Sequence, residues 1–324
     1  MTPLSSPGGA APRGLLPARS PAGDFGDVAL SDADLAWAEG TGGRRLRGRL
    51  RPAARVLLAP AVGIPGLVFV LIVLACFAGP QVFGLASPNA GTLTDTMRPL
   101  GAPGHLLGTN ALGNDELSRL LYGGRVSIIV GIGATAISLL VGTLLGMSAC
   151  YFGGFYEKVV MRLFDTLLAF PSLILALAIA DYLGPSLRNT VFAISLFGIS
   201  QFGRLAWSQT LRVRNRDFVA APRADGAGGR RIILGHILPN VLPPLLGLAL
   251  FSVGTAMMLE AGLSYLGLGI AQPNPSWGNM ISDGQQYLYQ APRLVILPCV
   301  ALVLTVVSLN LMADAIQRRQ GTRA

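Results

Sequence analysis

The chain has 324 residues, 52% of them hydrophobic and only 13% charged, and its mean hydropathy is +0.55. Because soluble domains contain about 25% charged residues, this composition argues against a water-soluble enzyme and excludes disorder over most of the length. The net charge of +9 comes from arginines that are clustered along the sequence, whereas a nucleic-acid-binding surface would have them spread out. Together with the high hydropathy, this indicates an integral membrane protein. Cys76, Cys150 and Cys299 lie in apolar runs without CxxC spacing, and neither a disulfide framework nor a thiolate metal site is expected.

Residues 1–55 precede the first apolar run and are rich in Pro, Gly, Ala and Ser. Because such a composition cannot form an apolar core, we expect a disordered cytoplasmic tail. Six arginines between Arg44 and Arg55 predict a basic collar against anionic lipid headgroups. The first apolar run starts too late and is too long to be the hydrophobic region of a cleaved signal peptide.

A membrane-spanning helix needs about 20 mainly apolar residues. Five segments of the chain meet this requirement, and a sixth is apolar in its first half but then contains Gln201 and Arg204. Polar residues of that kind must face protein or an aqueous path inside the membrane. The sequence therefore predicts an all-α integral membrane protein with six transmembrane helices, at residues 56–79, 126–150, 159–180, 190–211, 241–263 and 294–311.

The distribution of basic residues predicts the orientation of these helices. If the N-terminus is cytoplasmic, 19 basic residues lie in cytoplasmic segments and 4 in extracytoplasmic segments, as the positive-inside rule requires. Both termini are therefore expected in the cytoplasm, including a short tail at residues 318–324. Residues 80–124 are expected to form an extracytoplasmic loop, and a second outer stretch at 265–293 has the Trp, Tyr, Asn and Gln content of an ordered cap.

The cytoplasmic segment at residues 212–240 combines six arginines with a central stretch of small residues, Val219-Ala-Ala-Pro-Arg-Ala-Asp-Gly-Ala227. A short helix of small residues between two spans presents a low knob on the cytoplasmic face. Such a knob can fit a groove of another protein. The segment is thus a candidate contact with a cytoplasmic partner.

Several motifs occur together along the chain. They are Ala220-Ala221-Pro222 followed by Gly226, the run His236-Ile-Leu-Pro-Asn240, and His105-Leu-Leu-Gly-Thr-Asn110 and Pro273-Asn-Pro-Ser-Trp-Gly278 in the outer loops. With these motifs, residues 56–317 resemble the membrane subunits of binding-protein-dependent ABC importers. Within that family the sequence is most similar to the C-type permeases of dipeptide, oligopeptide and nickel systems.

The resemblance implies the type I ABC importer permease fold, with residues 125–317 as the permease core. It also implies a heterodimer with a second permease subunit, two cytoplasmic ATPase subunits and an extracytoplasmic substrate-binding protein, in the inner membrane of a bacterium. No nucleic acid partner is expected. The chain has no Gly-x-x-x-x-Gly-Lys-Ser/Thr phosphate loop, so we expect neither enzymatic activity nor a cofactor in it, with ATP and Mg bound by the partner ATPases.

The implied cargo is a di- or oligopeptide, with nickel, haem or a glutathione-like peptide as alternatives, because the binding protein largely selects the cargo in such systems. A secondary transporter is a less favoured interpretation, since the spans lack paired carboxylates and a recognisable inverted repeat. An intramembrane enzyme is disfavoured because the spans contain no Ser/His dyad and no HExxH motif.

The resemblance implies that the middle of segment 212–240 is a coupling helix that touches an ATPase. The sequence departs from the family pattern there, since Ala220 replaces the family glutamate, Pro222 replaces an alanine and Asp225 replaces an apolar residue. Either the helix starts later, with Pro222 near its N-terminus, or it is kinked against an adapted groove, or coupling is weakened. The residues expected to contact the ATPase are Arg216, Ala220, Ala221, Arg223, Ala224, Gly226 and Ala227.

Charged or kinking residues within the spans are candidates for the translocation path or its gate. Asp165 lies three residues after Arg162 and forms either an intrahelical ion pair or a gate contact. Gln201 and Arg204 either line the path or reach the cytoplasmic headgroups, and Glu260 is either a structural pairing partner or part of the path. The path candidates are Asp165, Gln201, Arg204, Glu260 and Pro171, the last expected to kink the third span.

Overall fold

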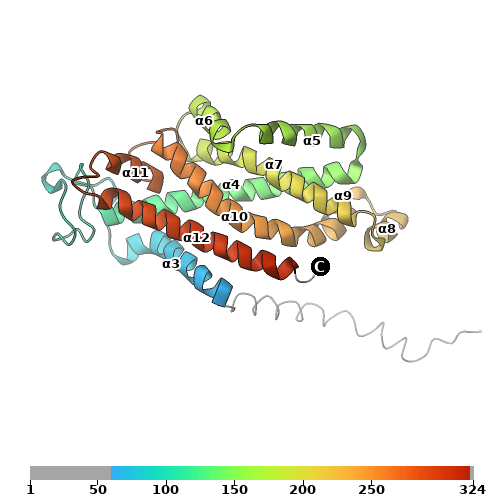
Figure 1. The fold of residues 1–324 in the computed structure, drawn as a ribbon, viewed down its shortest axis with the longest axis horizontal. Coiled ribbons are helices and arrows are strands. Elements are labelled where there is room, and N and C mark those ends of the chain that lie inside the picture. The colour runs from blue at the N-terminus through green and yellow to red at the C-terminus, as the bar shows by residue number, and fades with distance from the viewer. Residues whose placement is uncertain (1–59, 322–324) are drawn as a thin grey trace, which may run out of the picture. The chain divides into compact units, whose positions relative to one another are not determined.

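The computed structural model describes residues 60–321 of the chain. The fold below is that of these residues. The expected tail at residues 1–55, its basic collar and the end of the C-terminal tail lie outside the described residues. All regular secondary structure within residues 60–321 is helical, with two isolated β-bridges and no strand (Figure 1), which confirms the predicted all-α class.

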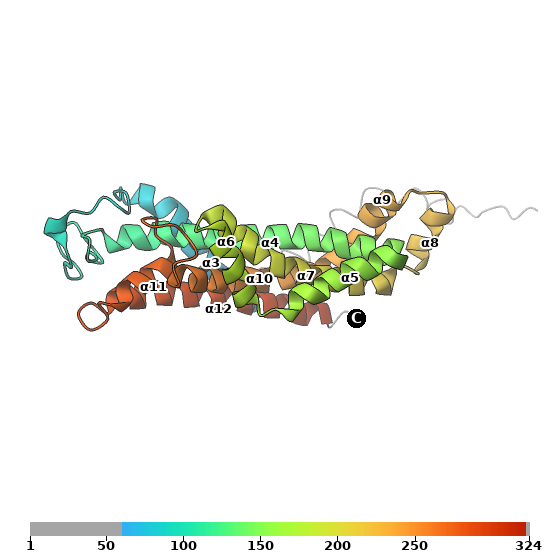
Figure 2. The same cartoon turned by 90° about the horizontal axis from the view of Figure 1, so that it is seen from above.

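The described helices form a bundle around one long central helix, α4 (Glu116–Phe152). The helices that pack most extensively against α4 are α3 (Pro60–Val82), α7 (Leu187–Val213) and α10 (Leu238–Tyr265). The last helix, α12 (Arg293–Gly321), packs against α10 and α3. Figures 1 and 2 both show these helices running along the same long axis, as expected for spans of one membrane.

Small residues explain the close packing of α4 against α7. A Cβ atom on Gly146 would lie 2.1 Å from the carbonyl oxygen of Gly203, and one on Gly142 would lie 2.4 Å from that of Ile199. Neither position therefore accepts a side chain without separating the two helices. Helices associate in membranes through small residues of this kind.

Four stretches of helix are long and apolar enough to cross a membrane. They are Gly63–Val82, Glu116–Phe152, Gly229–Tyr265 and Arg293–Arg318, and the bent pair of helices at 154–183 makes a fifth if it counts as one span. The span predicted at residues 190–211 corresponds to α7, which is too polar to be counted among these four stretches. Its 27 residues would nevertheless reach about 40 Å, and it packs along α4.

The third expected span is not one helix. Helix α5 (Gly154–Ala169) is followed after two residues by α6 (Ser172–Leu183), and their axes differ by 93°. Pro171 has no N–H to continue the helix, and the preceding Phe170 is extended, with φ −86° and ψ 136°. The predicted bend at Pro171 is confirmed. It is so sharp that α5 ends and α6 begins there, so the prediction of one continuous helix at 159–180 is wrong.

Several other boundaries also differ from expectation. Helix α4 begins at Glu116 rather than at residue 126, because the Asp115 carboxylate caps it by accepting a 2.8 Å hydrogen bond from the Ser118 amide. The outer loop expected at 80–124 is shortened accordingly. The interval between the predicted spans at 126–150 and 159–180 shrinks to Gly153, which has a positive φ of 69°.

The outer stretch before α12 is ordered, as predicted. It contains helix α11 (Trp277–Gln285), capped by the Ser276 hydroxyl, which accepts a hydrogen bond from the Asn279 amide. Trp277 is 1% exposed, and its indole N–H donates a 3.0 Å hydrogen bond to the Leu120 carbonyl. This contact fixes α11 to the N-terminal end of α4.

Candidate functional site

The segment in which a coupling helix is expected contains helix α8 (Asp217–Ala224), at the opposite end of the bundle from α11 (Figures 1 and 2). It is capped at Arg216, whose carbonyl accepts hydrogen bonds from the amides of Val219 and Ala220. Asp217 in the first turn interacts favourably with the helix dipole. Pro222 therefore lies in the last turn, and the interpretation in which the helix starts near Pro222 is wrong, because the helix already begins at Asp217.

Gly226 of the family motif ends this helix. It has a φ of 79°, and its amide donates to the Arg223 carbonyl at 3.2 Å while the next amide, that of Ala227, donates to the Pro222 carbonyl at 2.9 Å. This pair of hydrogen bonds is a Schellman motif with glycine in the left-handed position. A Cβ on Gly226 would meet no atom within 4 Å, so backbone conformation rather than space selects glycine.

Most of α8 faces away from the bundle. Val219 alone among the α8 residues is buried, at 1% exposed, and it packs in a core cluster with Phe202 and Ile232. The predicted contact residues Arg216, Ala220, Ala221, Arg223, Ala224 and Gly226 are exposed, and Ala227 is half-buried. The helix thus presents a surface of small side chains that is anchored by one valine.

Two arginines attach this region to the end of α4. The Arg223 guanidinium lies 4.9 Å from the centre of the Tyr151 ring, within cation–π range. Arg214, just after α7, donates a hydrogen bond of 3.1 Å to the Cys150 carbonyl. Arg223 therefore has a partner inside the chain as well as an exposed surface.

The coupling segment continues without a break into a span. Helix α9 (Gly229–Ile232) leads into a π-helical turn, η2 (Ile233–Ile237), and then into α10. Ile232, Ile233 and Ile237 are buried in the same core cluster as Val219. Because π-helical turns concentrate at functional positions in helices, η2 is a suitable joint between the coupling segment and α10.

Two of the path candidates form an ion pair between helices. Asp165 on α5 accepts a contact of 2.9 Å from Nη1 of Arg204 on α7. The intrahelical pair of Asp165 with Arg162 is therefore wrong, because α7 supplies a closer cation. Gln201, one turn before Arg204, is also exposed and borders a small cavity between α4, α7 and α10.

Glu260 is separated from this exposed face. It is fully buried, and its carboxylate accepts hydrogen bonds of 2.7 Å from the hydroxyls of Ser127 and Ser264. Ser127 in turn accepts a 3.4 Å hydrogen bond from the Trp277 amide. Glu260 thus belongs to a buried network that joins α4, α10 and α11. Of the two roles predicted for it, its burial supports the structural one and contradicts a position on an open path. Pro171 is exposed at the α5–α6 bend.

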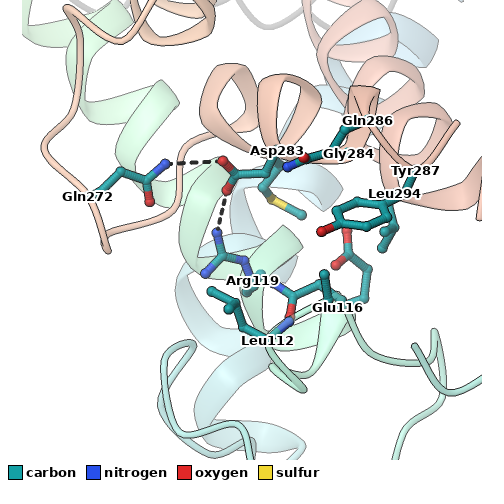
Figure 3. A pocket seen from close by; sticks show the side chains of 12 residues that line it. Leu112, Glu116, Arg119, Gln272, Asp283, Gly284, Gln286, Tyr287 and Leu294 are labelled. Carbon is teal, nitrogen blue, oxygen red and sulfur yellow. Dashed lines mark hydrogen bonds and ion pairs between the residues drawn. The ribbon is translucent and has the colours of Figure 1, made fainter. Parts of the chain in front are cut away.

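A cavity of about 300 Å³ lies at the N-terminal end of α4, beside α11 (Figure 3). Arg119 and Asp283 form an ion pair of 3.3 Å in its wall, and Gln272 donates a 3.2 Å hydrogen bond to Asp283. Burial raises the pKa of Asp283, against the opposing effect of the Arg119 guanidinium. No sequence motif marks this cavity, because its wall comes from separate segments of the chain. The lining residues are Asn110, Ala111, Leu112, Glu116, Arg119, Gln272, Met280, Asp283, Gly284, Gln286, Tyr287 and Leu294.

Comparison with known proteins identifies the family. The sequence model of the binding-protein-dependent transport system inner membrane components matches residues 138–324, and the chain belongs to this family. The dipeptide transport permease DppC of Alkalihalophilus pseudofirmus is 37% identical over 271 residues, which cover 82% of this chain and 88% of that protein. The di/tripeptide permease DppC of Pseudomonas aeruginosa is 41% identical over 212 residues, or 65% and 70% of the two chains.

Two further matches extend this picture. The glutathione transport permease GsiD of Escherichia coli is 34% identical over 213 residues, which cover 66% of this chain and 70% of that protein. Among solved structures, the inward-facing MetNI methionine ABC transporter matches with a TM-score of 0.51 and 18% identity, over 62% of this chain and 95% of that chain. This last likeness concerns the fold alone. The predicted class, a membrane component of a binding-protein-dependent transport system, is confirmed by the family match.

Proposed function

We propose that the chain is a permease subunit of an ATP-driven importer of di- and oligopeptides. The observation that carries this proposal is the match to peptide permeases across most of both chains. In this proposal a second permease completes the translocation path, two ATPases bind below, and a substrate-binding protein docks outside. Both termini lie in the cytoplasm, and the complex resides in the inner membrane of a bacterium.

The surface of α8 supplies the ATPase contact in this proposal. Small exposed side chains such as Ala221 and Ala224 let the helix enter a groove closely. Val219 and Arg223 tie α8 to the core and to α4, while α9 and η2 continue into α10. Closure of the ATPases would therefore move α8 together with the ends of two spans, as a rigid-body change driven from an interface. ATP and Mg are bound by the partner ATPases.

The ion pair of Asp165 with Arg204 supplies part of the polar lining of the path. The two side chains are 46% and 51% exposed, although they lie on α5 and α7, which are expected to cross the membrane. Exposed charges at such positions require water or a protein partner, because lipid cannot solvate them. Gln201 extends the same polar face.

The cargo is proposed from the relatives. The dipeptide permease matches over 271 residues and the di/tripeptide permease is 41% identical, while glutathione, the cargo in the name of a third relative, is itself a small peptide. A glutathione-like peptide is therefore the second candidate cargo, ahead of nickel or haem.

Uptake of labelled L-alanyl-L-alanine into cells that lack the gene tests this function. We expect the wild-type chain to restore uptake and Ala221→Trp to abolish it, because an indole cannot enter a close helix–groove contact. The matched control is Ala90→Trp, since Ala90 is exposed in the outer loop and should retain uptake. Failure of the wild-type chain to restore uptake of any di- or oligopeptide, with its partner subunits expressed, would contradict the proposal.

A further inference from the structure

The cavity beside α11 contains one carboxylate without a partner. Glu116 is 2% exposed, and its carboxylate has no hydrogen bond or ion pair within the described residues. The other carboxylate in the wall, that of Asp283, is already paired with Arg119 and Gln272. Arg119 also donates to Asn89 at 3.3 Å. The wall therefore holds one unpaired acidic group.

The nearest other cation is directed elsewhere. Arg293, which is close enough to influence Glu116 electrostatically, donates from Nη2 to the carbonyl of Arg98 at 2.7 Å and to that of Thr109 at 3.3 Å. It does not line the cavity. Burying an ionised carboxylate without a partner is costly, so a cation inside the cavity would relieve that cost.

The surroundings of Glu116 fit an organic ammonium group. Figure 3 shows the Glu116 side chain reaching toward Tyr287 and Leu294. A carboxylate beside an aromatic ring can bind a cation through both charge and the ring face. An ammonium group has three donors, and the side-chain amide of Gln286 in the wall offers a further acceptor. The side-chain oxygen of Asn110 already accepts hydrogen bonds from the amides of Leu112 and Asn114.

The size and the remaining walls of the cavity fit a short peptide. A volume of about 300 Å³ is at the lower end of the range for small-molecule sites. Leu112, Met280 and Leu294 give the cavity apolar sides next to its polar groups. Helix α11, which contributes to the cavity wall, lies at the opposite end of the bundle from α8 (Figure 1). This is the outer end if α8 is cytoplasmic.

We propose that this cavity binds the α-ammonium group of a short peptide through Glu116, and so forms an outer recognition site for cargo. The inference rests on the proposed function, because it takes the cargo to be a peptide that arrives from outside. It assigns the permease itself a contact with the amino end of the cargo.

Binding of two dipeptides to the full chain in lipid nanodiscs tests this site. The probes are L-alanyl-L-alanine and its N-acetyl derivative, which lacks the ammonium group. We expect acetylation to weaken binding by about 10-fold or more, the usual effect of losing a charge-assisted hydrogen bond. Glu116→Gln should weaken binding of the free dipeptide equally, and acetylation should cause no further loss in that variant.

Two measurements separate this role from a structural one. The control Asp181→Asn removes an exposed carboxylate outside the cavity and should leave the affinity unchanged. Thermal unfolding of Glu116→Gln should occur at the same or a higher temperature than in the wild type, because the variant removes an unpaired buried charge. A lower unfolding temperature would mean that Glu116 stabilises the fold, and it would overturn the proposal.

Other outcomes also overturn the assignment. Equal affinities for the free and acetylated dipeptides would exclude recognition of the ammonium group. Binding of n-butylammonium through Glu116 without binding of the dipeptide would instead assign the cavity to a lysine of a docking protein. If cells take up dialanine through the chain while the nanodisc sample binds no dipeptide, the cavity proposal fails and the proposed function stands. If the dipeptide binds but cells show no uptake, the proposed function fails.

Discussion

Asp165 and Arg204 form a 2.9 Å ion pair between α5 and α7, and each side chain remains about half exposed. Because an ion pair in contact with water contributes little to stability, its position is more informative than its strength. The ion pair marks a surface of α5 and α7 that must face water or another protein, because lipid cannot solvate exposed charges.

Reversing these charges one at a time should impair transport. We expect Asp165→Arg and Arg204→Asp each to lower dialanine uptake by roughly 10-fold, because each leaves two like charges side by side on the proposed polar face of the path. The double variant with both changes should recover most of the uptake, since it restores an opposite pair. Arg162→Ala is the control and should have little effect. Equal losses in the single and double variants would show that the pair itself is not required.

Substitutions at Gly226 should follow backbone preference rather than side-chain size. The left-handed conformation costs a residue such as alanine roughly 1–2 kcal/mol, whereas asparagine adopts it more readily. We therefore expect Gly226→Asn to retain more uptake than Gly226→Ala, although asparagine is larger. If the alanine variant retains more uptake instead, space in the partner's groove rather than backbone conformation selects the glycine.

Glu260 should matter for folding rather than for transport. Glu260→Ala leaves the buried hydroxyls of Ser127 and Ser264 without an acceptor, at a cost of about 1–3 kcal/mol each. The variant should unfold at a lower temperature, while uptake per inserted molecule stays near the wild-type value. Glu260→Gln keeps one carbonyl acceptor and should be destabilised less. A loss of uptake in Glu260→Gln without loss of stability would instead show that Glu260 takes part in the translocation path.

Pro222 should be replaceable by the family alanine. It lies in the last turn of α8, where its missing N–H removes one hydrogen bond of the helix. We expect Pro222→Ala to keep or increase the ATPase activity stimulated by binding protein and peptide, because the alanine can donate that bond and leaves the exposed surface small. A strong loss of stimulated activity would indicate that the partner groove has adapted to the proline.

The spans were predictable from the sequence because membrane thickness sets a minimum apolar length. Most described spans contain the predicted segments and differ at their ends, where local capping decides. The capping residue Asp115 extends α4 outward, and Arg216 starts α8 before Pro222. Such caps depend on a few hydrogen bonds rather than on the average hydropathy of a window. The bend at Pro171 is predictable from the sequence, but the angle of 93° between α5 and α6 depends on how α6 packs.

Partners distant in the sequence could not be predicted in the same way. The spacing of Arg162 and Asp165 suggested a local ion pair, but α7 brings Arg204 to Asp165. A structural role for Glu260 is predictable from the sequence, but the two serines that donate hydrogen bonds to it from α4 and α10 are not. The cavity around Glu116 joins segments that only the fold brings together, and no motif in the sequence marks it.

Site-specific photo-crosslinking at Ala221 tests the central claim most directly. A benzoylphenylalanine introduced there, in cells that express the full chain and its neighbouring genes, lies on the exposed face of α8. We predict a covalent adduct with an ATPase subunit, identified by mass spectrometry, and no such adduct from the same residue at Ala90. Absence of an ATPase adduct at Ala221, or equal capture from both positions, would contradict the assignment of α8 as the coupling helix.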